Sequence, residues 1–319
     1  MSTQVHPSST AQSTTKPATV IVGVDGSAGN RAAVTWAHHE AEDLGGRLVL
    51  VGATHEYSPP TPRFSVDASE ECFRADTKRT LERVRDALRA SEAEVPILVG
   101  SGGALSVLLT AAEQADVLVV GKRGLGAVKR MIVGSNSVAV AGRSSIPVVV
   151  VPDLWKPVER LSVPVVVGLD GSTRDEAVLT YAFVRAVRLA VPLVVVYGWQ
   201  VPGVHSWSPK DIGRWGDEAK THVEQALRPW VARYPEVEVA TLAKDANAAM
   251  VILDAAAAAQ LVVLGRHTRP RHFGGFHLGS TTRAVLHCAE CPVAIIPSKT
   301  AHADVDEADH APDVVLPLY

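Results

Sequence analysis

The sequence has few cysteines, little net charge of either sign and no long uninterrupted apolar run. Three cysteines in 319 residues are too few for a disulfide framework, which fits a reducing compartment. The 31 basic and 34 acidic residues leave a formal net charge of only −3, so no overall positive field would attract a nucleic acid or an anionic membrane. With 47% hydrophobic residues, the composition is that of a globular chain. We therefore expect a cytoplasmic protein that binds neither nucleic acid nor membrane.

The most apolar segment, residues 248–265, is interrupted by Asp254 and Gln260 and is shorter than the ~20 residues that cross a bilayer. We interpret it as a buried helix followed by a strand. Residues 1–17 are rich in serine and threonine and lack the apolar core of a secretory signal, whereas residues 298–319 are acidic. These two ends predict a disordered leader and a solvated acidic tail.

An internal repeat organises the sequence between these ends. The segment Val20–Ser27 recurs as Val165–Ser172, at an offset of 145 residues that continues along the chain. A period this long indicates a duplicated domain, because solenoid repeats run roughly 20 to 50 residues. We place the two domains at residues 18–152 and 163–297, joined by a linker at residues 153–162 in which prolines and charged residues gather.

Within each copy, short runs of Val, Ile and Leu alternate with longer helical stretches. In the first copy we expect strands at residues 19–25, 47–53, 95–100, 117–121 and 146–151, and helices at residues 28–44, 70–91, 105–114 and from residue 135 onward. The Ser27 hydroxyl is expected to cap the first helix, and Gly45 and Gly46 are expected to end it. Continuous apolar strands separated by helices indicate a parallel sheet covered on both faces. The expected fold is therefore two tandem doubly wound α/β domains, which bind ligands beyond the carboxyl ends of their strands.

A glycine-rich loop follows the fourth strand of the first copy. It reads Gly121-Lys-Arg-Gly124, and nine residues later Gly134 and Ser135 open a helix. Glycines let backbone N–H groups approach phosphate oxygens, and a helix N-terminus adds unpaired donors and a partial positive charge. The spacing therefore favours an anion site. Four cations lie in or beside the loop, where they either offset the charge of a polyphosphate or face water: Lys122, Arg123, Lys129 and Arg130.

Asp25 ends the first strand and would lie beside this loop, where it can accept hydrogen bonds from a ribose hydroxyl or an adenine amine. The combination of Gly-x2-Gly-x9-Gly-Ser after the fourth strand with Val-Gly-Val-Asp-Gly-Ser on the first closely resembles the ATP-binding pattern of the universal stress protein family. The resemblance covers residues 19–297, and the tandem arrangement is similar to that of duplicated members in actinobacteria. It implies a five-stranded sheet of order 3-2-1-4-5 in each domain, with ATP, accompanied by Mg²⁺, at the ends of the first and fourth strands.

The resemblance also implies which residues hold the nucleotide. Adenine and ribose would contact Gly23, Val24, Asp25 and the backbone of Ala53. Gly102 would lie near the ribose and phosphates, and the phosphates would be lined by Gly121, Arg123, Gly124, Gly134, Ser135 and Asn136. Taken without the resemblance, Gly23 and Gly102 are equally well explained as tight turns at the strand ends. For Asp25 the alternative is a helix-capping carboxylate, which the pattern favours less than a ligand role.

The second copy keeps one part of this pattern and loses another. It retains Gly168, Asp170, Gly171, Ser172, Gly265, Gly279 and Ser280. However, Thr268 stands in place of Gly124, Ala246 in place of Gly102, and Pro270 removes a donor N–H inside the loop. We therefore expect weaker phosphate binding in the second copy, where the basic loop is either a looser anion site or simply solvated.

No nucleophile with a general base is recognisable, and no Walker lysine is followed by Ser or Thr, so we expect no catalytic residue and no enzyme activity beyond slow incidental ATP hydrolysis. Cys288 and Cys291 have CxxC spacing but precede a strand, whereas redox motifs of this spacing open a helix. The expected function is a nucleotide-responsive stress regulator. The alternatives are an adenine-nucleotide enzyme of a related α/β family with weak ATPase activity, and a scaffold that has lost nucleotide binding.

The last strand of each copy, at residues 146–151 and 291–296, is apolar and would lie at a sheet edge, where unpaired backbone groups invite pairing. These strands favour a homodimer. Alternatively, the two copies satisfy each other within one chain, and any further dimerisation uses helical faces.

Overall fold

The computed structural model describes residues 17–27, 29–54, 66–91, 94–124, 133–157, 163–171, 175–199, 209–266 and 278–297. The first half consists of β1 (Thr19–Gly23), α1 (Asn30–Asp43), β2 (Arg47–Thr54), α2 (Val66–Ala87), β3 (Ile97–Ser101), α3 (Ala104–Ala112), β4 (Val117–Gly121), α4 (Ser135–Arg143) and β5 (Val148–Val151). The second half consists of β6 (Val165–Leu169), α5 (Asp175–Leu189), β7 (Leu193–Trp199), α6 (Pro209–Arg233), β8 (Val239–Asp245), α7 (Ala248–Ala256), β9 (Leu261–Gly265), α8 (Ser280–Cys288) and β10 (Val293–Ile296). Strand and helix therefore alternate within each half, as the apolar runs predicted, and β5 is followed directly by β6 where the halves join.

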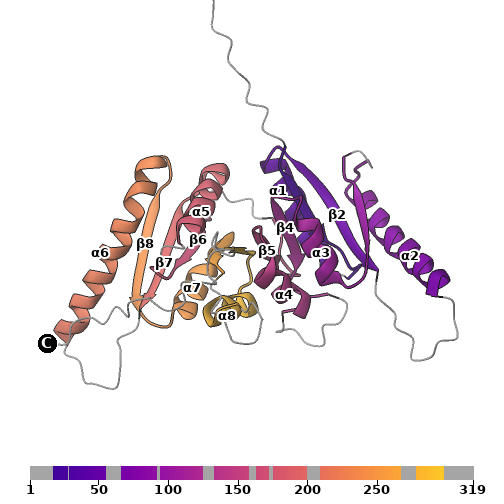
Figure 1. Ribbon diagram of the computed structural model, residues 1–319. Coiled ribbons are helices and arrows are strands. Elements are labelled where there is room, and N and C mark those ends of the chain that lie inside the picture. Colours follow the sequence, from indigo (N-terminus) through magenta and orange to yellow (C-terminus); the bar gives the residue numbers. More distant parts are fainter. Residues whose placement is uncertain are drawn as a thin grey trace, which may run out of the picture.

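The strands form a single ten-stranded sheet of order β3-β2-β1-β4-β5-β10-β9-β6-β7-β8. Each half has the strand order 3-2-1-4-5, and all its strands run parallel. The two halves meet where β5 pairs with β10 in the antiparallel sense, with Val149 opposite Ala294. Figure 1 shows β5 near the middle of the molecule and the long helices α2 and α6 at its two outer ends. The last strands of the two copies thus pair within the chain, and β3 and β8 are the outer strands of the sheet.

Helices cover both faces of the sheet, so its inner strands are buried on both sides. Val20 and Val22 of β1 face the cluster that includes α1, α2, α5 and α6, whereas Ile21 faces the cluster that includes α3, α4, α7 and α8. Both clusters run through the two halves without interruption. This two-sided burial explains why the inner strands are continuous apolar runs, whereas the outer strands β3 and β8 are partly exposed.

The start of α1 differs from the expectation. The helix begins at Asn30 after Gly29, and no side chain caps it, so the prediction that the Ser27 hydroxyl caps a helix from residue 28 was wrong. The Ser27 hydroxyl instead donates to Oδ1 of the Asn30 side chain, at 3.5 Å. The end of the helix agrees with the prediction, because Gly45 has a φ of +57°, a conformation that suits glycine.

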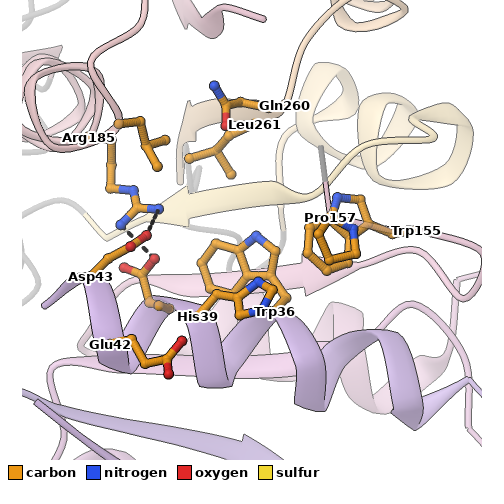
Figure 2. Close-up of a pocket in the computed structure, with 11 residues that line it drawn as sticks. Trp36, His39, Glu42, Asp43, Trp155, Pro157, Arg185, Gln260 and Leu261 are labelled. Atoms are coloured by element: carbon orange, nitrogen blue, oxygen red, sulfur yellow. Dashed lines mark ion pairs between the residues drawn. The ribbon is translucent and has the colours of Figure 1, made fainter. Parts of the chain in front are cut away.

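The halves also meet through the helices α1 and α5, beside a cavity of about 310 Å³ (Figure 2). Arg185 of α5 forms an ion pair of 2.6 Å with Glu40 of α1, and its guanidinium lies 5.9 Å from the centre of the Trp36 ring. Both members of the ion pair are almost fully buried. Among the residues that the structure describes, no helix is long and apolar enough to span a membrane.

Candidate functional site

The carboxyl end of β1 presents Asp25 at the surface of the first half. Asn30, at the start of α1, holds this turn: its Oδ1 accepts the Asp25 N–H at 2.7 Å and its Nδ2 donates to the Gly23 carbonyl at 3.2 Å. The Asp25 carboxylate also accepts the Ser27 N–H at 2.9 Å. Val24 is buried, and its N–H donates to the Val51 carbonyl of β2. These hydrogen bonds fix the backbone of the turn, and the Asp25 side chain is exposed. Asn30 supports the turn, although it was not predicted as a site residue.

The loop after β4 lies directly against Asp25. A Cβ added to Gly124 would overlap with Oδ2 of Asp25, and one added to Gly121 would lie 3.2 Å from the Arg123 carbonyl. The two motifs, which are separated by about a hundred residues in sequence, are therefore in contact, and glycine is required at position 124 for that contact. A backbone this close to an exposed carboxylate, without an intervening side chain, is the arrangement that a nucleotide would need in order to reach both groups.

The start of α4 completes the first-half site. Gly134 precedes the helix, and its N–H donates to the Lys122 carbonyl at 2.8 Å, which closes the loop onto β4. Ser135 and Asn136 are exposed in the first turn, where backbone N–H groups have no intrahelical partner and the helix dipole favours an anion. Ser137 was not predicted, although its buried hydroxyl donates to the Gly121 carbonyl at 2.8 Å. Thr282 makes the equivalent bond to Gly265 in the second half, so the repeat itself carried the signal.

Arg123 lies in the loop and pairs with Asp153 at 3.0 Å. Its guanidinium is half-buried near the end of β4, next to the glycines that are predicted to line the phosphates. The predicted cations Lys129 and Arg130 lie outside the described residues.

Lys122 does not face the loop. Its side chain is buried, and its Nζ donates to the carbonyl of Ala289, at the end of α8 in the second half, at 2.9 Å. Burial lowers the pKa of this lysine, and the neighbouring Arg123 lowers it further. The expectation that Lys122 either neutralises a phosphate or faces water was therefore wrong, because the other half supplies a carbonyl acceptor that the local sequence does not reveal.

Ala53 and Gly102 lie on the outer side of the site. Ala53 is half-buried near the end of β2, opposite Gly100 of β3, and Gly102 follows β3 with a φ of +109°. That conformation explains the glycine as a turn residue. All eleven predicted site residues are within the described part of the chain, and all lie in β2 or near the carboxyl ends of β1, β3 and β4 or the start of α4.

The second half repeats the turn after its first strand and the end of its second strand, with altered details. Asp170 is exposed after β6, and Asp175 replaces the asparagine that supports the first-half turn. At Gly198, the counterpart of Ala53, a Cβ would lie only 2.5 Å from the Cα of Ala248 in α7. The strand end and the helix start are therefore closer than in the first half, which accommodates an alanine there. The predicted loop residues Thr268 and Pro270 lie outside the described residues, as does Ser172.

The buried member of the cysteine pair, Cys291, is a poor nucleophile at neutral pH. Cys291 is buried, and burial raises the pKa of its thiol to about 11, so the thiolate is disfavoured at neutral pH. Within the described parts of the chain, no group of three or more His, Cys, Asp or Glu side chains is placed to hold a metal ion.

Both halves match the model of the universal stress protein family, over residues 18–152 and 164–297. The chain belongs to this family. A universal stress protein of Mycobacterium tuberculosis strain H37Rv is 32% identical over 302 residues, covering 86% of this chain and 94% of the relative. One of Mycolicibacterium smegmatis is 32% identical over 288 residues, covering 87% of this chain and 96% of that relative.

Among solved structures, a universal stress protein from Archaeoglobus fulgidus aligns with a TM-score of 0.63 at 17% identity, covering 89% of this chain and 97% of that one. This likeness concerns the fold. The matches to the mycobacterial relatives extend over nearly their whole length, so this universal stress protein shares with them its tandem pair of domains.

Proposed function

We propose that the first half of this universal stress protein binds ATP together with Mg²⁺, and that the protein is a cytoplasmic, nucleotide-responsive regulator without enzyme activity of its own. The observation that carries the proposal is the contact between Asp25 and Gly124, which joins the ends of β1 and β4 beside the start of α4. A nucleotide at this edge would reach a carboxylate and a helix N-terminus at the same time.

Each group has a role that follows from its chemistry. The Asp25 carboxylate would accept hydrogen bonds from ribose or adenine, and Gly124 and Gly121 would leave their backbone accessible to phosphate oxygens. The first turn of α4, at Ser135 and Asn136, would stabilise the phosphate charge, and Arg123 would neutralise part of it. When bound, ATP would bring a polyphosphate charge to this loop.

Regulation is supported by the way the loop is tied to the other half. The Lys122 carbonyl accepts the Gly134 N–H that closes the loop, while the Lys122 side chain bonds to Ala289 at the end of α8. A change in the loop on binding ATP would therefore act on α8 through one residue.

We further propose that the second half binds ATP at least tenfold more weakly, a difference of ~1.4 kcal/mol or more. Two features support this: Thr268 replaces a glycine that has no room for a Cβ in the first half, and the gap between β7 and α7 at Gly198 is narrow. A full-length chain should therefore show one tight site per chain in a calorimetric titration with ATP and Mg²⁺.

The direct test compares Gly124→Glu with Gly213→Glu. The first variant places a carboxylate on Asp25 and in the phosphate loop, and it should abolish the tight ATP site. Gly213 lies in α6 with open space around its Cβ position, so its variant should bind ATP like the unmodified protein. Asp25→Ala should weaken binding about tenfold through the loss of a charged hydrogen bond. Unchanged ATP affinity in a folded Gly124→Glu protein would refute the site.

The same preparations distinguish the other candidate functions. A folded protein that binds no ATP would favour the scaffold, and steady turnover of ATP with a defined acceptor would favour the enzyme. We also propose a homodimer, which would use helical faces because β5 and β10 already pair within the chain. Sedimentation of a single species at the 33.8 kDa chain mass at micromolar concentration would rule out that dimer.

A further inference from the structure

One buried position differs chemically between the two halves. Asn30 and Asp175 are equivalent, 145 residues apart, and each begins the first helix of its half. In the first half the asparagine both accepts and donates: its Oδ1 accepts from the Asp25 N–H and its Nδ2 donates to the Gly23 carbonyl. An ionised aspartate accepts but cannot donate, so the same arrangement in the second half lacks a proton.

The contacts of the Asp175 carboxyl show which of its two oxygens lacks a hydrogen-bond partner. Its Oδ2 accepts the Gly171 N–H at 2.9 Å, and the Asp170 backbone N–H also bonds to this carboxyl. Its Oδ1 is buried and has no hydrogen-bond partner among the residues that the structure describes, in a side chain whose residue is only 7% exposed. The Asp170 side chain lies within hydrogen-bonding reach of the Asp175 carboxyl. If both carboxylates were ionised, they would repel each other, whereas one shared proton forms a hydrogen bond between them.

Among the described residues, the other charged and titratable groups around the pair do not replace the proton. Tyr197 of β7 has its pKa raised, by burial and then by Asp170 and Asp175, so it stays neutral. The His222 imidazole of α6 packs near Gly171 and Tyr197. Arg266, after β9, bonds across to Ser144 of the first half, and Glu176 follows Asp175 on α5 and is exposed. Burial, reinforced by Asp170, raises the pKa of Asp175 to about 7.

We propose that Asp170 and Asp175 hold one proton between them at neutral pH, and that this proton makes nucleotide binding by the second half pH-dependent, tighter at lower pH. The binding part rests on the proposed function, because Asp170 is the counterpart of Asp25. With the proton in place, Asp170 keeps its charge, is held by a hydrogen bond from Asp175 and faces the nucleoside. Without it, two adjacent negative charges repel each other and the phosphates of an incoming nucleotide.

The proton itself is tested without any nucleotide. The full-length protein, labelled with ¹³C at the aspartate carboxyls, is titrated by NMR from pH 4 to 9, and the signal that disappears in Asp175→Asn identifies the residue. The pair should lose one proton between pH 6 and 8. A His222→Gln protein should show the same step, which would exclude the imidazole as its source. A carboxyl that titrates near its ordinary pKa of about 4 would overturn the proposal, whatever the protein binds.

The coupling is tested by calorimetry with ATP at pH 6 and pH 8. In the Gly124→Glu protein, whose first site is disabled, ATP affinity of the second half should fall about tenfold between the two pH values. Adding Asp175→Asn should remove this dependence and leave the tighter binding at pH 8. Conversely, Asn30→Asp in the unmodified chain should make the first site weaken as pH rises.

The outcomes separate this inference from the proposed function. An affinity of the second half that does not change with pH, or the absence of ATP binding to it at either pH, would overturn the coupling while leaving the first-half site untouched. Failure of the first half to bind ATP would refute the proposed function, and the NMR titration would still decide whether the proton is held.

Discussion

The buried Asp175 carboxyl makes the stability of the protein depend on pH. Its buried Oδ1 has no donor among the described residues of the folded chain, whereas in the unfolded chain the carboxyl is hydrated and ionises near its ordinary pKa. The folded pKa is therefore the higher of the two, at about 7. Between the unfolded and the folded pKa, the folded state binds more protons, so stability falls as pH rises from about 4 to about 7 and stays at the lower level above that.

Replacing Asp175 with Asn should remove this loss. At pH 8 we expect Asp175→Asn to be more stable than the unmodified protein by about 2 kcal/mol, which is less than the full pKa shift implies because solvent screens part of it. Near pH 4 the two proteins should have similar stability. Urea unfolding at pH 4, 6 and 8 measures this, with Glu176→Gln on the exposed side of the same helix turn as the control. A stability difference that does not grow with pH would contradict the assignment.

At the same scale, sequence patterns located the groups of the candidate site but not their supports. The contact of Asp25 with Gly124 follows from adjacent parallel strands ending at one edge, which the repeat and the apolar runs predict. Asn30 and Ser137 were missed because a buried asparagine or serine has no periodic signature. Their side chains bond to the Gly23 and Gly121 carbonyls, which only the folded backbone places within reach.

At the scale of elements, two cations hold the last helix of the opposite half. Lys122 bonds to Ala289, the residue after α8, and Arg266 bonds to Ser144, the residue after α4. The two bonds are equivalent under the repeat. A cation at a helix C-terminus also interacts favourably with the helix dipole. The sequence analysis could not assign this role to Lys122, because its partner lies 167 residues away and belongs to the other copy.

Lys122→Met keeps most of the apolar stem and removes the charge and the bond to Ala289. We expect a loss of about 1–3 kcal/mol in unfolding free energy, because the buried Ala289 carbonyl is left without its donor. Lys156→Met, at an exposed position, should change stability by less than about 0.5 kcal/mol. Urea unfolding of the two variants measures the difference. If Lys122→Met and Lys156→Met are equally stable, water replaces the Lys122 ammonium at the Ala289 carbonyl without loss of unfolding free energy.

At the scale of the whole molecule, the junction is built from equivalent positions that carry opposite charges. Glu40 and Arg185 are related by the 145-residue offset, and so are Asp43 and Arg188. In a symmetric association of two identical copies, equivalent residues approach each other across the axis, so two Glu40 side chains or two Arg185 side chains would meet. The observed pair of 2.6 Å forms only between the first half and the second. The repeat offset contained this information, but it becomes readable only once α1 and α5 are known to face each other.

Exchanging the charges of Glu40 and Arg185 tests whether the ion pair stabilises the observed association of the two halves. Glu40→Arg or Arg185→Glu alone buries two like charges, and each should cost about 3–5 kcal/mol. The double exchange restores an ion pair in the opposite sense and should recover more than half of that loss, with Asp43, which lies 3.9 Å from the guanidinium and is partly exposed, limiting the recovery. The matched control exchanges Lys78 and Glu82, an exposed pair on α2 whose single variants should cost below about 1 kcal/mol. Unfolding free energies of the four proteins of each cycle give the coupling between the charges. If the double exchange is no more stable than the single variants, the junction depends on the β5–β10 pairing and on apolar packing, and the charges have no part in matching the two halves.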